Sequence, residues 1–120
     1  MITKKFDLFW VFYVYIIENL NNNKSDSVNQ FICDANPFIW EGQSWDPSLF
    51  DKFSQMCEFY DNFSNNGYAL IISFIKELDE IYNDIKRIFS SIDINDYIKQ
   101  TSIIFKNGFD NYFRKYRITN

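Results

Sequence analysis

The stretch IISFIKELDEIYNDIKRIF, residues 71–89, decides the fold class of this chain. Its apolar residues recur three or four positions apart, which is the spacing of one helical face. These residues are Ile71, Phe74, Ile75, Leu78, Ile81, Tyr82, Ile85, Ile88 and Phe89. The spacing predicts a single helix over residues 71–89. After residue 20 no segment shows the alternation of a half-buried strand, so strands are not expected there.

A second helix is predicted immediately before this stretch, over about residues 47–63. Asp46-Pro47 starts it, because Asp accepts free backbone N–H groups and Pro suits the first helical position. Asn65-Asn66-Gly67 is predicted to end it, because Asn and Gly tolerate the left-handed conformation common after a helix.

The remaining sequence predicts three more helices. Asp93 or Asn95 caps a helix over about residues 93–116, which Gly108 is expected to kink or break. A chain of 120 residues with 21% Phe, Tyr and Trp can fill a sizeable core. We therefore predict an all-α fold, a compact bundle of about five helices in a single helical domain covering residues 1–120. The two helices not yet named cover about residues 4–20 and 26–36.

Residues 8–17, LFWVFYVYII, are apolar on every side and are expected to be buried. Pattern alone does not decide between helix and strand here, since the segment is rich in strand formers. Ten apolar residues fall short of the roughly 20 that a membrane-spanning helix needs. Lys4 and Lys5 precede the segment as in a signal peptide, but Asp7 interrupts it and no small-residue cleavage site follows. We therefore expect a cytoplasmic protein without a membrane segment.

The composition excludes several common kinds of active site. The chain has no His, which removes Ser-His-Asp and Cys-His catalysis, His metal ligands and a His pH switch. Cys33 and Cys57 form no CxxC motif, have no His as activating base, and are expected to be small buried thiols. Gly42, Gly67 and Gly108 are too scattered to form a phosphate loop. We expect no enzymatic activity, no cofactor and no metal.

The charge is unevenly distributed along the chain. Residues 25–84 hold eleven acidic and two basic residues, a net charge of −9, whereas residues 85–120 carry +4 and residues 1–24 carry +1. Phosphate binding needs Lys and Arg, so we expect no direct nucleic-acid contact by the acidic segment. Such a segment attracts a cationic partner, and it also fits a plain solvated acidic surface.

The predicted partner-binding residues come from this acidic segment. Its helical carboxylates lie away from the apolar stripes, where water keeps them ionised. Trp45 stands beside Asp46 in an irregular stretch, and an aromatic side chain next to carboxylates is typical of protein-binding hot spots. Phe38 and Trp40 are instead predicted to fold back over the core. The predicted site consists of Trp45, Asp51, Glu58, Asp61, Glu77, Glu80 and Asp84.

Residues 34–53 carry a motif that resembles a known group of proteins. Asp34-Ala35-Asn36-Pro37-Phe38-Ile39-Trp40 is followed by Ser44-Trp45-Asp46-Pro47 and then by Phe50 and Phe53. The pattern resembles α-helical immunity proteins (CdiI-type) of contact-dependent growth inhibition and related polymorphic toxin systems. The resemblance covers about residues 30–63. It implies a cytoplasmic antidote that binds one cognate toxin domain, often a nuclease, and has no catalytic residues. It leaves the toxin-contacting residues open, since the motif itself can be scaffold.

The charge distribution points in the same direction as the resemblance. Nuclease domains are basic because they hold nucleic acid, so an inhibitor that covers one needs an acidic face. The sequence therefore predicts an immunity protein that binds a basic toxin domain as a monomer in a 1:1 complex. The alternative is a helical protein-binding adaptor or regulatory module without a toxin partner.

Overall fold

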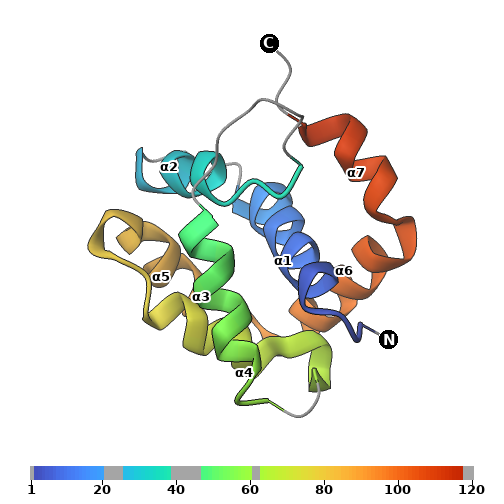
Figure 1. The fold of residues 1–120 in the computed structure, drawn as a ribbon, viewed down its shortest axis with the longest axis horizontal. Coiled ribbons are helices and arrows are strands. Elements are labelled where there is room, and N and C mark those ends of the chain that lie inside the picture. The colour runs from blue at the N-terminus through green and yellow to red at the C-terminus, as the bar shows by residue number, and fades with distance from the viewer. Residues whose placement is uncertain (1, 21–25, 39–46, 61–62, 118–120) are drawn as a thin grey trace.

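The computed structural model describes residues 2–20, 26–38, 47–60 and 63–117 (Figure 1). Of these residues 80% are helical and none is in a strand, which confirms the predicted all-α class. In chain order the elements are α1 (Lys5–Leu20), α2 (Asp26–Asp34), α3 (Pro47–Cys57), α4 (Ser64–Lys76), the 3₁₀ helix η1 (Glu80–Tyr82), α5 (Asn83–Phe89), α6 (Ile94–Asn107) and α7 (Phe109–Tyr116).

Helix α1 lies at the centre of the molecule, and the other helices surround it (Figure 1). Every residue from Leu8 to Ile16 is at most 2% exposed. The ring of Phe12 makes edge contacts with rings of three different helices: Phe31 of α2, Phe74 of α4 and Phe89 of α5. A helix satisfies its own backbone hydrogen bonds, so side chains can enclose it on all sides, whereas a strand here would need a neighbouring strand.

The predicted helix over residues 71–89 is interrupted, so the prediction of about five helices is wrong. The described part of the chain contains seven α-helices and one 3₁₀ helix. Helix α4 ends at Lys76, and Asp79 has extended backbone angles (φ −60°, ψ 159°) before η1 begins. Gly108 also separates α6 from α7, as the sequence analysis anticipated.

Other helices supply hydrogen-bond partners for the backbone groups that this break leaves free at the helix ends. The Nζ atom of Lys52 on α3 donates to the carbonyl oxygen of Glu77 at 2.6 Å. The backbone N–H of Asp84 in α5 donates to Oγ of Ser27 on α2 at 3.2 Å. Because free N–H and C=O groups at helix ends need such partners, contacts distant in sequence stabilise the break.

The break also changes which residues of the stripe are buried. Leu78 is 3% and Tyr82 is 2% exposed, but Ile81 is 57% exposed. The Tyr82 hydroxyl donates to the carboxylate of Asp34 at 2.7 Å and so ties η1 to α2. An unbroken helix would place all three apolar side chains on one face, so the prediction of Ile81 as a core residue is wrong.

The first turn of α4 has left-handed backbone and packs against two other helices. Helix α3 already ends at Cys57, and the positive φ angles of Asn65, Asn66 and Gly67 (54°, 54° and 73°) lie in the first turn assigned to α4. The prediction of left-handed backbone is therefore confirmed, but its place at the end of the preceding helix is wrong. A Cβ atom on Gly67 would lie 2.6 Å from Cδ2 of Leu8, so glycine also permits close approach to α1.

Several side-chain hydrogen bonds hold this turn against α6. The Nδ2 atom of Asn66 donates to Oγ1 of Thr101 at 2.9 Å, and the hydroxyl of Tyr97 donates to the carbonyl oxygen of Asn66 at 2.9 Å. Thr101 and Tyr97 are fully buried. Since buried polar groups are costly without partners, these bonds specify where α4 starts relative to α6.

The described residues of the Asn-Pro-Phe motif are part of the core. Phe38 is fully buried and its ring lies 5.0 Å from that of Phe109 on α7, which confirms that it folds back over the core. Asn36 is 4% exposed, and its Oδ1 accepts the backbone N–H of Phe38 at 2.8 Å. Phe53 is fully buried against Phe9. Trp40 lies outside the described residues.

Cysteine burial differs between the two positions. Cys57 is buried, and burial raises the pKa of its thiol to about 11. Cys33 is exposed, so the expectation of a buried thiol is wrong for Cys33.

None of the described helices combines the length and apolar character needed to cross a bilayer.

Candidate functional site

The described acidic residues of the predicted site lie on α3, directly after α3, in the turn after α4, in η1 and in α5. Asp51 lies on α3 and is exposed, and Lys52 beside it contacts the backbone of Glu77. The middle of α3 therefore adjoins the turn that carries Glu77 and leads to Glu80 at the start of η1. Glu77 and Glu80 are also exposed. In the described part of the chain none of these three carboxylates has an ion-pair partner. We call Asp51, Glu77 and Glu80 the acidic surface.

Two other predicted residues are paired with basic side chains. Glu58, just after α3, forms an ion pair with Lys5 at the start of α1. The hydrogen bond from Lys5 and its positive charge hold the pKa of the Glu58 carboxyl below its usual value. Asp84 pairs with Arg87 at 3.6 Å within α5. These pairs leave Glu58 and Asp84 with less charge to offer a partner, while Trp45 and Asp61 lie outside the described residues.

Two exposed apolar side chains accompany these carboxylates. Phe59 follows Glu58 and is 86% exposed, and Ile81 follows Glu80 and is 57% exposed. Exposed apolar residues beside charges are candidate anchors for a protein partner. Sequence analysis could have found Phe59, because it falls off the apolar stripe of the predicted helix over 47–63. It missed Ile81, because Ile81 lies on the predicted core stripe.

A pocket of about 360 Å³ lies elsewhere, where the end of α1 meets the turn between α5 and α6. We call it the α1–α6 pocket. Its polar lining comes from Tyr15 and Asn19 of α1 and from Asp93 and Asp96 at the start of α6. Ile88, Ser91 and Ile92 complete the lining.

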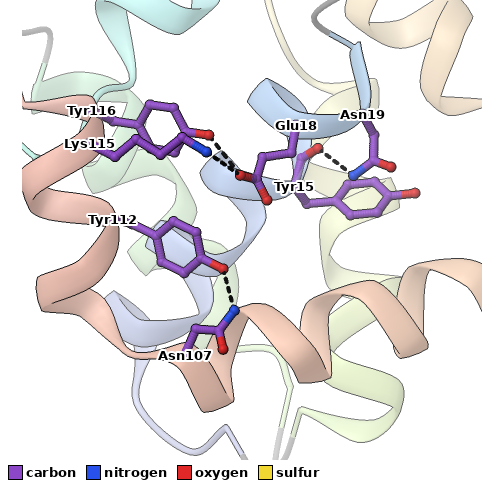
Figure 2. Close-up of polar contacts among 7 residues, drawn as sticks. All are labelled: Tyr15, Glu18, Asn19, Asn107, Tyr112, Lys115 and Tyr116. Carbon is purple, nitrogen blue, oxygen red and sulfur yellow. Dashed lines mark hydrogen bonds and ion pairs between the residues drawn. The ribbon is translucent and has the colours of Figure 1, made fainter.

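Local hydrogen bonds fix the polar residues of the α1–α6 pocket. Asp93 caps α6, and its Oδ2 accepts the backbone N–H of Asp96 at 3.0 Å, as the sequence predicted for this helix start. The Nδ2 atom of Asn19 donates to the carbonyl oxygen of Tyr15 at 3.0 Å (Figure 2). The Tyr15 ring packs edge-on against Tyr97 with centroids 5.1 Å apart.

Burial and negative charge together act on the Tyr15 hydroxyl. Burial is the main cause that raises its pKa to about 12, and the nearby carboxylates of Asp96 and Asp93 contribute in the same direction. The phenol is therefore protonated at neutral pH and can both donate and accept a hydrogen bond.

Side chains of helix α7 contact the C-terminal end of α1, the end that lines the α1–α6 pocket. Figure 2 shows Glu18 with two partners from α7: Lys115 Nζ at 3.3 Å and the Tyr116 hydroxyl at 2.8 Å. Asn107 Nδ2 also donates to the Tyr112 hydroxyl at 3.0 Å across the break at Gly108. These contacts orient α7 and leave the carboxylate of Glu18 occupied.

A second, smaller pocket of about 170 Å³ is mainly apolar and has a basic rim. It is lined by Ile72, Ile75, Lys76, Lys86, Phe89 and Ser90. The two pockets therefore differ in charge. Among the described residues no three Cys, Asp or Glu side chains are grouped as metal ligands would be.

The acidic surface and the α1–α6 pocket both offer carboxylates to a positively charged group, one as an open surface and the other as a concave site. Comparison with known proteins found no matching family model, no matching curated protein and no matching solved structure.

Proposed function

We propose that this chain is an immunity protein that binds a cognate toxin and neutralises it by stoichiometric association. The observation that carries the proposal is the acidic surface of Asp51, Glu77 and Glu80, whose exposed carboxylates have no ion-pair partner within the described residues. Exposed carboxylates attract a basic partner and speed its association. A nuclease domain has the required positive charge, because it holds phosphates.

An apolar side chain suited to a short-range contact, that of Ile81, follows Glu80 of the acidic surface in the sequence. Ile81 is 57% exposed beside Glu80, in a segment that Tyr82 anchors to α2. An apolar side chain presented by a fixed backbone loses little conformational freedom on binding. We therefore assign Ile81 as the anchor and Asp51, Glu77 and Glu80 as the charges that orient the approaching toxin.

Co-expression tests the proposed function directly. Producing the chain together with a candidate toxin encoded next to it should restore growth, and the two proteins should elute as a 1:1 complex. Ile81→Asp should weaken that complex while leaving the circular dichroism spectrum unchanged. Absence of both rescue and complex with such toxins would overturn the proposal and favour the alternative, a helical adaptor or regulatory module.

Charge reversal on the acidic surface is expected to slow association with the toxin. Asp51→Lys plus Glu80→Lys should reduce the association rate about 10- to 100-fold at low salt, because steering by opposite charges is lost. The difference from the unmodified chain should shrink towards 1 M salt, where the screening length is about 3 Å. Stopped-flow or surface plasmon resonance measurements over a salt series would measure this.

Asp26→Lys plus Asp110→Lys is the matched control for this charge reversal. Both residues are exposed, and the pair changes the net charge by the same amount at positions outside the acidic surface. The control should slow association by no more than about 3-fold. Equal slowing by both pairs would mean that only the overall charge matters, and the assignment of the acidic surface would then fail.

A further inference from the structure

The α1–α6 pocket shares no residue with the acidic surface and contains an unusual polar group. Tyr15 is only 1% exposed, yet its hydroxyl has no hydrogen-bond partner among the described residues, and Figure 2 shows contacts only at its backbone carbonyl. Tyr13, two residues earlier and equally buried, donates its hydroxyl to the carbonyl oxygen of Ile32 at 2.6 Å. Buried tyrosine hydroxyls normally have such a partner.

The free hydroxyl of Tyr15 faces the pocket. In the described part of the chain no fully enclosed side-chain oxygen or nitrogen lacks a partner, so this hydroxyl keeps a small solvent-accessible area. Tyr15 lines the α1–α6 pocket, and its ring is held from the core side by Phe89 and Tyr97. The pocket is therefore where a ligand would find this hydroxyl.

The rest of the lining defines which ligand suits the pocket. Asp93 and Asp96 contribute two carboxylates, and Asn19 keeps a side-chain oxygen free because its Nδ2 is the atom bonded to Tyr15. These groups are all hydrogen-bond acceptors, and the two carboxylates carry negative charge. The side chains of Ile88 and Ile92 form an apolar part of the pocket wall. A planar guanidinium has five donors and is more weakly hydrated than an ammonium, so it fits several acceptors beside apolar carbon.

We propose that the α1–α6 pocket is a binding site for an alkylguanidinium group, held by Asp93, Asp96 and the Tyr15 hydroxyl. The group can come from an arginine side chain of a polypeptide or from a free guanidino compound, and both present the same chemistry to these residues. The proposal goes beyond the neutralisation of a toxin, because the pocket and the acidic surface are separate.

Titration with ethylguanidinium chloride at constant ionic strength, followed by amide chemical shifts, tests the site. Saturable shifts should be confined to the pocket residues, with a Kd on the order of 1–10 mM for so small a ligand. N-ethylurea, which has the same shape without the charge, should produce no saturable shift. Butylammonium should bind at least 3-fold more weakly than ethylguanidinium. Equal binding of either control overturns the proposal.

Substitutions in the pocket test the three assigned groups. Asp93→Asn plus Asp96→Asn should weaken ethylguanidinium binding at least 10-fold, and Asn at position 93 still caps α6. Tyr15→Phe should weaken it about 3- to 10-fold. Asp110→Asn, an exposed acid on α7, is the control and should leave the Kd unchanged. Retained affinity in the pocket variants would show that the ligand binds elsewhere and would overturn the assignment.

Stability separates a ligand-binding hydroxyl from a structural one. Tyr15→Phe removes a hydroxyl without a protein partner, so Tm should stay within about 2 °C of the unmodified chain. Tyr13→Phe removes the bond to Ile32 and should lower Tm by about 3–6 °C. A loss of Tm in Tyr15→Phe as large as that in Tyr13→Phe would assign the Tyr15 hydroxyl to the fold and overturn its role in binding.

A third ligand distinguishes the two sources of the guanidinium group. Binding of N-acetylarginine methylamide as tight as that of ethylguanidinium supports an arginine within a polypeptide. If N-acetylarginine methylamide does not bind while ethylguanidinium does, the ligand is a free guanidino compound. The guanidinium site itself is then still supported. No toxin is needed for any of these measurements, so their failure leaves the proposed function standing and the failure of toxin rescue leaves the pocket standing.

Discussion

Gly67→Ala is expected to lower the free energy of unfolding by about 2–5 kcal/mol, which combines left-handed strain with overpacking. Gly67 has a φ angle of 73°, which L side chains rarely adopt. The added Cβ would also lie 2.6 Å from Cδ2 of Leu8, which is fully buried in α1, where close packing restricts its movement. Chemical denaturation with an unchanged m-value would measure the loss.

Two comparisons separate the strain from the clash. Gly108→Ala has a positive φ of 91° but no atom within 4 Å of the new Cβ, so it should show the backbone cost alone. Gly67→Ala combined with Leu8→Ala should be less destabilising than the sum of the single changes, because the smaller residue removes the clash. Strict additivity would mean that Leu8 does not restrict position 67.

Leu78→Ala is expected to cost about 2–5 kcal/mol, because removing a buried Leu side chain leaves a cavity. Leu78 is 3% exposed in the turn between α4 and η1. Ile81→Ala is the matched control: it removes similar apolar volume, but Ile81 is 57% exposed, so the change should stay within about 0.5 kcal/mol.

This pair of variants also tests the break itself. A continuous helix over residues 71–89 would bury both side chains and make the two losses similar. The broken arrangement predicts a difference of at least about 1.5 kcal/mol between them. Urea unfolding of both variants against the unmodified chain measures it, and equal losses would contradict the break at Glu77–Asp79.

Local signals predicted much of the fold correctly. Periodicity placed helices near their observed positions, Asp93 was one of the two caps proposed for α6, and Gly108 was expected to kink or break the helix. These features depend on residues within a few positions of each other, so a single sequence contains the information. The helix–strand ambiguity of residues 8–17 had a different origin, since a segment enclosed on all sides carries no periodicity.

The interruption after Lys76 could not be predicted in the same way. Glu77, Leu78 and Asp79 contain no Gly or Pro to signal an end, and the contacts that stabilise the break come from Lys52 and Ser27 on other helices. The pocket was missed for the same reason: Tyr15 and Asp96 are far apart in sequence, and only the packing of α1 against α6 brings them together. The acidic residues were correctly expected to be mostly exposed, but their pairing with Lys5 and Arg87 required tertiary information or a specific rotamer.

The enclosure of α1 has a consequence for synthesis of the chain. The ribosome releases α1 before α6, against which α1 packs, and α6 ends only at Asn107. At about 5–20 residues per second, the interval between the two is on the order of ten seconds. During that time the side of α1 that packs against α6 lacks its native cover and is accessible to chaperones and to other nascent chains. We therefore expect this domain to reach its native state only after most of its length has been translated.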